Sequence, residues 1–198
     1  FSCFILVMAL CATTTANAQF RESWDESWET DWRDGDTVGE ANGWGKVFGE
    51  ICIDAKSGFG QSAAVRVSAE HKGGGAFKLL DKTYRDGVFI VRGLCKVATP
   101  MENCALGPWK DERNYAHLWM KGHKAGLKVM VDGQWRPEPI HDDQPFADLG
   151  WYEAQVVYDL DKREMSARYR DIDDESGVPL GPWKSLGKFH TEVPWDVA

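Results

Sequence analysis

The pentapeptide Leu-Gly-Pro-Trp-Lys occurs twice in this chain, at residues 106–110 and 180–184. A Gly-Pro turn precedes each tryptophan, so each indole is expected to emerge at a loop or at the start of a strand. The C–H face of a sugar ring stacks on an exposed indole, while nearby polar groups bond its hydroxyls. The alternative is that both tryptophans cap the ends of a hydrophobic core. The candidate carbohydrate-binding residues are Trp109, Trp183, Lys110 and Asn114.

An acidic segment forms a second candidate site. The run 171–177 reads Asp-Ile-Asp-Asp-Glu-Ser-Gly and offers carboxylate oxygens before a glycine turn. Calcium prefers oxygen ligands of this kind, so calcium is the candidate cofactor and Asp171, Asp173 and Glu175 are its candidate ligands. The alternative is a solvated turn in an acidic protein.

Three cysteines follow residue 18, namely Cys52, Cys95 and Cys104. Cys95 and Cys104 flank a short loop that contains Pro100, and a disulfide between them would close that loop. We therefore predict the pair Cys95–Cys104. Cys52 is then left over, either as a small buried side chain on a strand or as the partner of a cysteine beyond this sequence.

Residues 1–18 are predicted to be a signal peptide. The apolar run 4–10 is followed by small residues that end in Ala16-Asn17-Ala18, a signal-peptidase pattern, so cleavage is expected before Gln19. The run is too short to span a bilayer, and no transmembrane segment is expected in the mature chain. Cys11 leaves a lipoprotein as the alternative. The protein is expected to be secreted, periplasmic or at the cell surface.

The mature chain is patterned as β-strands from end to end. Apolar residues alternate with polar ones around Val65, Val129 and Tyr169, which indicates strands with one buried face. The denser apolar runs 88–91 and 156–158 are typical of central strands, and residues 159–162 are expected to connect two strands. The sequence predicts an all-β, antiparallel two-sheet jelly-roll sandwich over residues 19–198.

The net charge of the chain argues against two classes of binding partner. The chain has 198 residues and a formal net charge of −8. An acidic surface repels phosphate backbones and anionic membrane surfaces, so we expect neither nucleic acid nor an anionic membrane as a partner. All ten tryptophans lie after residue 18, which favours a glycan or polysaccharide instead.

Two stretches resemble concanavalin A-like (LamG-like) jelly rolls of secreted bacterial proteins. The run 29–44 passes from an acidic, aromatic segment through glycines to Gly43-Trp44, and the run 150–161 begins Gly-Trp-Tyr-Glu and turns through acidic residues. The resemblance spans about residues 24–190 and implies the jelly-roll fold. Trp24, Trp28 and Trp32 are expected to pack on the sheet or to form an aromatic patch. The strand that usually completes such a sandwich is not evident, so we expect C-terminal strands to be missing.

Enzymes on this fold provide the catalytic alternative. Laminarinase-like glycosidases carry three alternating carboxylates on one strand, whereas residues 50–54 read Glu-Ile-Cys-Ile-Asp and place a cysteine at the centre. Alginate-lyase-like jelly rolls use an arginine-rich strand and a tyrosine. The run Arg168-Tyr169-Arg170 weakly resembles that pattern. No catalytic residue is assigned from the sequence.

Three functions follow from these patterns. The first is a non-catalytic domain that binds carbohydrate or a cell surface through exposed aromatic side chains. The second is a carbohydrate-active enzyme, either a polysaccharide lyase or a glycoside hydrolase. The third is a structural or protein-interaction domain with an exposed apolar patch.

Overall fold

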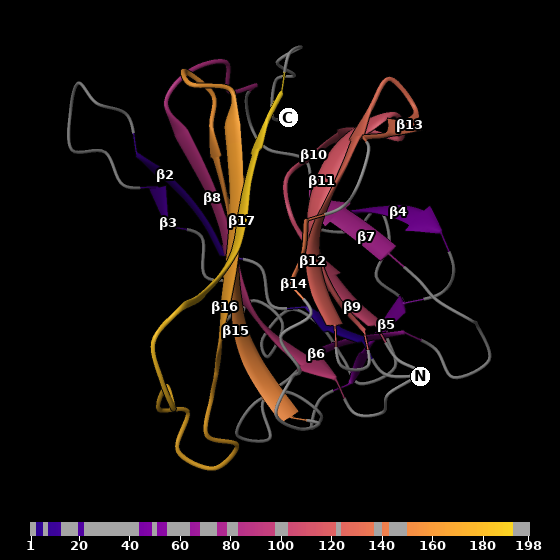
Figure 1. Cartoon of the computed structure of the whole chain (residues 1–198). Helices are drawn as coiled ribbons and strands as arrows, with labels where there is room; N and C mark the ends of the chain where they lie inside the picture. The colour runs from indigo at the N-terminus through magenta and orange to yellow at the C-terminus, as the bar shows by residue number, and fades with distance from the viewer. Residues whose placement is uncertain are drawn as a thin grey trace.

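The computed structural model describes a chain built of β-strands, with no helix among the described residues (Figure 1). Those residues are 3–5, 8–12, 20–21, 44–48, 51–54, 64–67, 75–78, 83–97, 103–121, 124–136, 140–142 and 150–191. Trp24, Trp28 and Trp32 lie outside them. Accordingly, no membrane-spanning helix occurs in the part of the chain that is described.

The larger sheet contains seven strands in the order β17-β16-β15-β8-β2-β3, and β1 also pairs with β8. All pairings in it are antiparallel. Its strands are β1 (Cys3–Ile5), β2 (Met8–Ala12), β3 (Phe20–Arg21), β8 (Val88–Val97), β15 (Gly150–Asp159), β16 (Glu164–Asp171) and β17 (Lys184–His190). Strands β1 and β2 therefore come from the predicted signal peptide and pair with β8 in this chain.

The second sheet contains six strands around the central pair β11 and β12. Strands β9 and β10 both pair with β11, while β13 and β14 both pair with β12. Its strands are β9 (Asn103–Leu106), β10 (Trp109–Asp111), β11 (Asn114–Lys121), β12 (Lys124–Val131), β13 (Gln134–Trp135) and β14 (Ile140–Asp142).

Two smaller antiparallel pairs complete the described structure. They are β4 (Trp44–Phe48) with β7 (Gly75–Lys78), and β5 (Ile51–Asp54) with β6 (Ala64–Val67). Figure 1 shows β4 and β7 on the side of the six-stranded sheet that faces away from the seven-stranded sheet. Strand β5 includes Cys52 and Asp54 of the segment 50–54 that was compared with the glycosidase motif.

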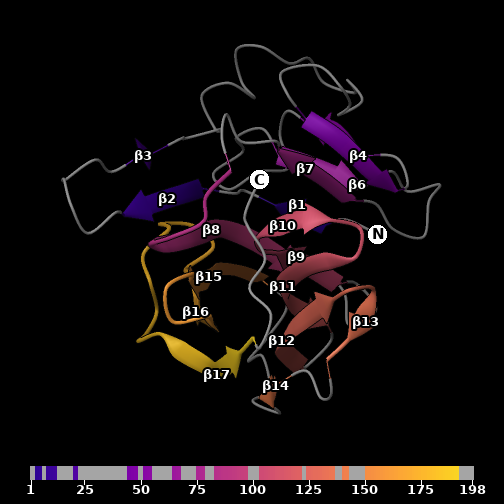
Figure 2. The ribbon, with the colours of Figure 1, turned by 90° about the horizontal axis from the view of Figure 1, so that it is seen from above.

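The two large sheets pack face to face around a shared apolar core. Figure 2 shows them as separate layers, with β14 and β17 side by side at one edge. The core is formed from alternate residues of both sheets, because successive side chains of a strand point to opposite faces. Its largest fully buried side chains are Leu118, Met120, Leu127, Val156, Tyr158, Met165, Tyr169 and Leu186.

The alternation read from the sequence is confirmed in the described strands. Val129 and Tyr169 are 4% and 0% exposed and belong to the core, as predicted. Strands β15 and β16 form the expected hairpin, with Asp159 paired to Glu164 at its end. Asp132 and Gly133 make the turn after β12 and both have positive φ, 54° and 77°, a conformation that favours Asp-Gly. The side chain of Val65 lies outside the described residues.

Candidate functional site

The two copies of Leu-Gly-Pro-Trp-Lys both present their tryptophan at the beginning of a strand. Trp109 is the first residue of β10, and Trp183 directly precedes β17. These strands belong to different sheets. Trp109 pairs with Tyr115 on the outer face of the six-stranded sheet, whereas Trp183 contacts arginines on the outer face of the seven-stranded sheet. The structure therefore does not bring Trp109 and Trp183 into one site.

Trp109 is held within the structure by an aromatic contact. Its ring stacks on Phe77 of β7 with a centroid distance of 4.2 Å and an interplanar angle of 14°. The amide nitrogen of Asn114 donates to the Asp111 carboxylate at 3.1 Å, and its amide oxygen accepts from the backbone of Asp132 at 3.0 Å. Lys110 is half-buried beside them. Asn114 thus ties two turns together, and one face of Trp109 is covered.

Trp183 lies on a cluster of arginines. The guanidinium carbons of Arg168 and Arg170 are each 4.5 Å from the centroid of its ring, and that of Arg92 is 5.7 Å away. Guanidinium groups over an indole are attracted by the negative face of the ring. Trp183 is half-buried beside these cations. We call the set Arg92, Glu153, Gln155, Arg168, Arg170 and Trp183 the arginine face.

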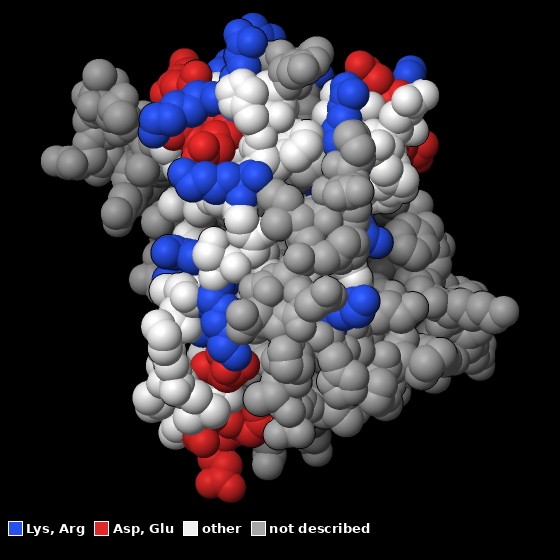
Figure 3. All heavy atoms as spheres, viewed as in Figure 1, with Lys and Arg blue, Asp and Glu red and all other residues white. Residues whose placement is uncertain are grey.

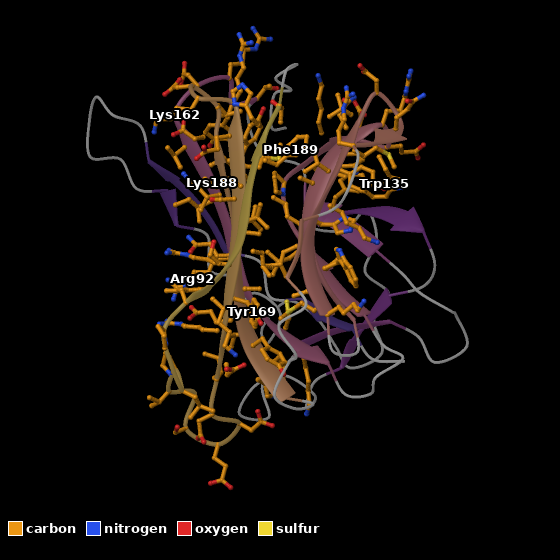
Figure 4. All side chains as sticks on the ribbon, in the orientation of Figure 1. Arg92, Trp135, Lys162, Tyr169, Lys188 and Phe189 are labelled. Atoms are coloured by element: carbon orange, nitrogen blue, oxygen red, sulfur yellow. The ribbon has the colours of Figure 1, made fainter. Side chains whose placement is uncertain are left out.

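The strand register explains why these residues meet. Gln155 of β15 is paired with Arg92 of β8 on one side and with Arg168 of β16 on the other. Glu153, two residues earlier on the same face, is paired with Arg170. Because every second residue of a strand points to the same side, both rows project away from the core. Figure 4 shows Arg92 on this outer side and Tyr169 pointing inward.

A single carboxylate serves two of the three arginines. Glu153 is 7% exposed and forms ion pairs with both Arg92 and Arg170. Arg168 donates from Nε to the amide oxygen of Gln155 at 2.6 Å, which is a neutral partner. A buried carboxylate is stabilised by such charged donors, and they hold the guanidinium groups in place. Three positive charges and one negative charge leave an excess of two positive charges on this face.

The space-filling view agrees with a local excess of positive charge in a chain that is acidic overall. In Figure 3 basic side chains lie in the middle of the side formed by the seven-stranded sheet and, together with acidic ones, at its upper end, while acidic side chains gather at its lower end. The formal net charge of the whole chain is −8. The arginine face is therefore a local positive region, where an anionic group is attracted.

Sequence reasoning identified Trp183 but missed most of its partners. Arg92, Glu153 and Gln155 are polar residues inside long strands that are otherwise rich in apolar residues. Polar side chains in the middle of central strands are the sequence signal that could have found them, since a polar group buried there requires a hydrogen-bond or charge partner. Tyr169, which was grouped with its neighbouring arginines in the lyase-like pattern, is 0% exposed and lies on the opposite face of β16.

The outer face of the six-stranded sheet carries a second cluster. The ring centroids of Tyr115 and His117 are 5.7 Å apart, and Trp135 meets both edge-on at 5.5 and 5.8 Å. The Lys128 ammonium lies 4.5 Å from the centroid of Trp119 and 5.8 Å from that of Trp135. Burial, together with the charge of Lys128, lowers the pKa of His117 to about 4. We call this set the aromatic face.

The acidic residues of the predicted calcium loop make contacts within the protein. Asp171 accepts a hydrogen bond from the Lys184 ammonium at 2.7 Å. Asp173 accepts from the backbone and the hydroxyl of Ser176 at 2.8 and 2.6 Å, and these bonds lower its pKa. Glu175 is exposed. No group of three or more His, Cys, Asp or Glu side chains placed to hold a metal occurs within the described ranges.

Cys95 is a free thiol buried in the core, so the predicted disulfide with Cys104 is not formed in this structure. Strands β8 and β9, which carry the two cysteines, lie near each other. The side chain of Cys104 lies outside the described residues, and the bond remains a prediction for the protein in an oxidising compartment.

No protein-family model matches the chain, and no curated protein matches it either. The candidate function therefore depends on the residues and their geometry.

Proposed function

We propose that this chain is a non-catalytic carbohydrate-binding domain with an antiparallel jelly-roll fold, and that it acts outside the cytoplasm as a secreted, periplasmic or cell-surface protein. Support for the fold comes from two antiparallel sheets that share one core. Support for export comes from the leader pattern of residues 1–18.

The observation that carries the proposal is Trp183 lying on the arginine face. Trp183 is only half-buried, and its neighbours supply hydrogen-bond donors and acceptors beside it. A sugar needs both features, an apolar surface for its C–H face and polar groups for its hydroxyls. Guanidinium groups that are already held by Glu153 and Gln155 lose little conformational freedom on binding.

The charges on this face favour binding rather than hydrolysis. Glycosidases use two carboxylates about 5 to 10 Å apart, one of them free to donate a proton. The described arginine face contains a single carboxylate, that of Glu153, and two arginines engage its oxygens. Such a group is poorly suited to act as a general acid or a nucleophile.

The proposal is tested by screening the purified chain on a glycan array, with and without a calcium chelator, and by measuring the affinity for any glycan retained. Trp183→Ala is expected to weaken binding about tenfold or more. Trp135→Ala is the matched control, because Trp135 is 49% exposed but lies on the opposite outer face.

Each outcome decides the proposal. Loss of binding in Trp183→Ala alone, with the unfolding temperature retained, supports it. No binding to any glycan, or equal binding by wild type and Trp183→Ala, contradicts it. Release of reducing ends or of unsaturated sugars from a bound polysaccharide would show that the domain is an enzyme. Loss of binding when calcium is removed would show that a metal ion takes part in glycan binding.

A further inference from the structure

We infer that the arginine face recognises a carboxylate-bearing polysaccharide, a polyuronate, rather than a neutral glycan. This rests on the proposed function and specifies its ligand class. The inference starts from the excess of two positive charges on the face, in a chain whose net charge is −8.

Arg168 is the residue best placed to meet the ligand. It is exposed, its partner Gln155 is neutral, and within the described part of the chain no carboxylate neutralises it. A guanidinium group offers several N–H donors in a planar fork, and one bond to Gln155 leaves others available. This planar fork matches the two oxygens of a carboxylate.

Arg92 and Arg170 extend the positive region across the sheet. The Arg92 side chain is 40% exposed and that of Arg170 is 22% exposed, so both reach the surface while they hold Glu153. Arg92 lies two strands from Arg168, and Arg170 lies two residues along β16 from Arg168. The guanidinium carbons of all three lie within 5.7 Å of the centroid of the Trp183 ring. Cations gathered around one aromatic ring suit an acidic sugar residue, which offers an apolar face and a carboxylate together.

Trp183 adds a contact that a purely electrostatic site lacks. Its ring lies against Arg168 and Arg170, so a sugar that binds beside the indole brings its carboxylate near these guanidinium groups. The combination of an indole and arginines selects an acidic sugar ring, because a neutral sugar gains only the stacking contact.

The test compares two forms of one polymer. Polygalacturonate and its fully methyl-esterified form share a backbone, and only the first carries carboxylates. Isothermal titration or affinity electrophoresis of the whole chain is expected to show at least tenfold tighter binding to the acidic form, weakened by added salt. Alginate and heparin serve as further polyuronate and sulfated probes.

Variants then assign the binding to this face. Arg168→Gln is expected to lower the affinity for polygalacturonate about tenfold, with only a small fall in the unfolding temperature, because the side chain is exposed but donates one hydrogen bond to buried Gln155. Arg136→Gln is the matched control, since it removes one arginine near the end of the six-stranded sheet. Arg168→Lys keeps the charge but loses the fork, and is expected to bind with intermediate affinity.

The outcomes separate this inference from the proposed function. Equal binding of the acidic and esterified polymers, with both lost in Trp183→Ala, overturns the inference and leaves carbohydrate binding in place. Binding to heparin without binding to either polyuronate also overturns it. Binding to neither polymer by a chain that binds no array glycan overturns both proposals. Preferential binding of the acidic form that Arg168→Gln removes and Arg136→Gln retains supports the inference.

Discussion

Leu106 and Leu180 occupy the same place in the repeated pentapeptide, yet Leu106 is 3% exposed and Leu180 is 65% exposed. The following Gly107 packs against the backbone of β11, whereas Gly181 has open space beside it. In the first copy Trp109 is covered by Phe77, and in the second Trp183 rests on arginines. The same five residues therefore form a turn followed by a tryptophan in both copies. The neighbouring strands decide whether the segment packs in the core or lies at the surface.

The largest difference between the two copies is expected when the glycine of each copy is replaced by alanine. A Cβ at Gly107 would lie 2.0 Å from the carbonyl oxygen of Ala116 and 2.7 Å from the Cα of His117, while a Cβ at Gly181 would meet nothing within 4 Å. Gly107→Ala is expected to lower the free energy of unfolding by about 3 kcal/mol or more, because backbone atoms must move. Gly181→Ala is expected to change it by less than about 0.5 kcal/mol.

Urea denaturation followed by tryptophan fluorescence measures both glycine variants. A Gly107→Ala chain that fails to fold agrees with the expectation, provided that Gly181→Ala folds normally. Equal stability of the two variants would contradict the different packing of the two copies.

Truncation of the leucines tests the same difference with a smaller change. Leu106→Ala removes a buried side chain of the core and is expected to cost about 3 kcal/mol, from lost burial and the cavity that remains. Leu180→Ala removes an exposed side chain and is expected to cost less than about 0.5 kcal/mol. Thermal unfolding of both variants checks this, and a large loss in Leu180→Ala would show that the second copy is covered by another part of the protein.

Lowering the pH is expected to destabilise the aromatic face more than the arginine face. Among the described residues, only the aromatic face holds a buried histidine. The pKa of His117 is lowered to about 4, so the folded chain keeps the ring neutral at a pH where the unfolded chain binds a proton. The stability that this provides is complete above pH 6.5 and is lost as the pH falls to about 4, by about 2 to 3 kcal/mol. Unfolding by urea at a series of pH values measures the slope.

His117→Phe is the control for that slope, since it replaces the imidazole with a ring that does not titrate. The variant is expected to lose most of the pH dependence between pH 6.5 and 4. Asp159 and Asp173 also have lowered pKa values, and their contribution is lost mainly below about pH 4, so it overlaps only the acid end of this window. An unchanged slope in His117→Phe would contradict the assignment to His117.

Much of the fold could be predicted because alternation is a local property of the chain. Val129 and Tyr169 lie inside as their patterns indicated, and the hairpin after Asp159 forms where the acidic turn was expected. The candidate site was predicted only in part. Trp183 was identified from its turn, but Trp109 belongs to the other sheet, and the contacts of Glu153 and Gln155 were not anticipated.

The sequence by itself determined the strands and the side of each strand that faces the core, because a two-residue period follows from backbone geometry alone. Only the tertiary structure decided which outward residues meet. Arg92 and Arg168 are 76 positions apart along the chain, and the register of β15 between their strands places both beside Gln155. Likewise, burial of Leu106 and exposure of Leu180 depend on neighbouring strands that the pentapeptide does not encode.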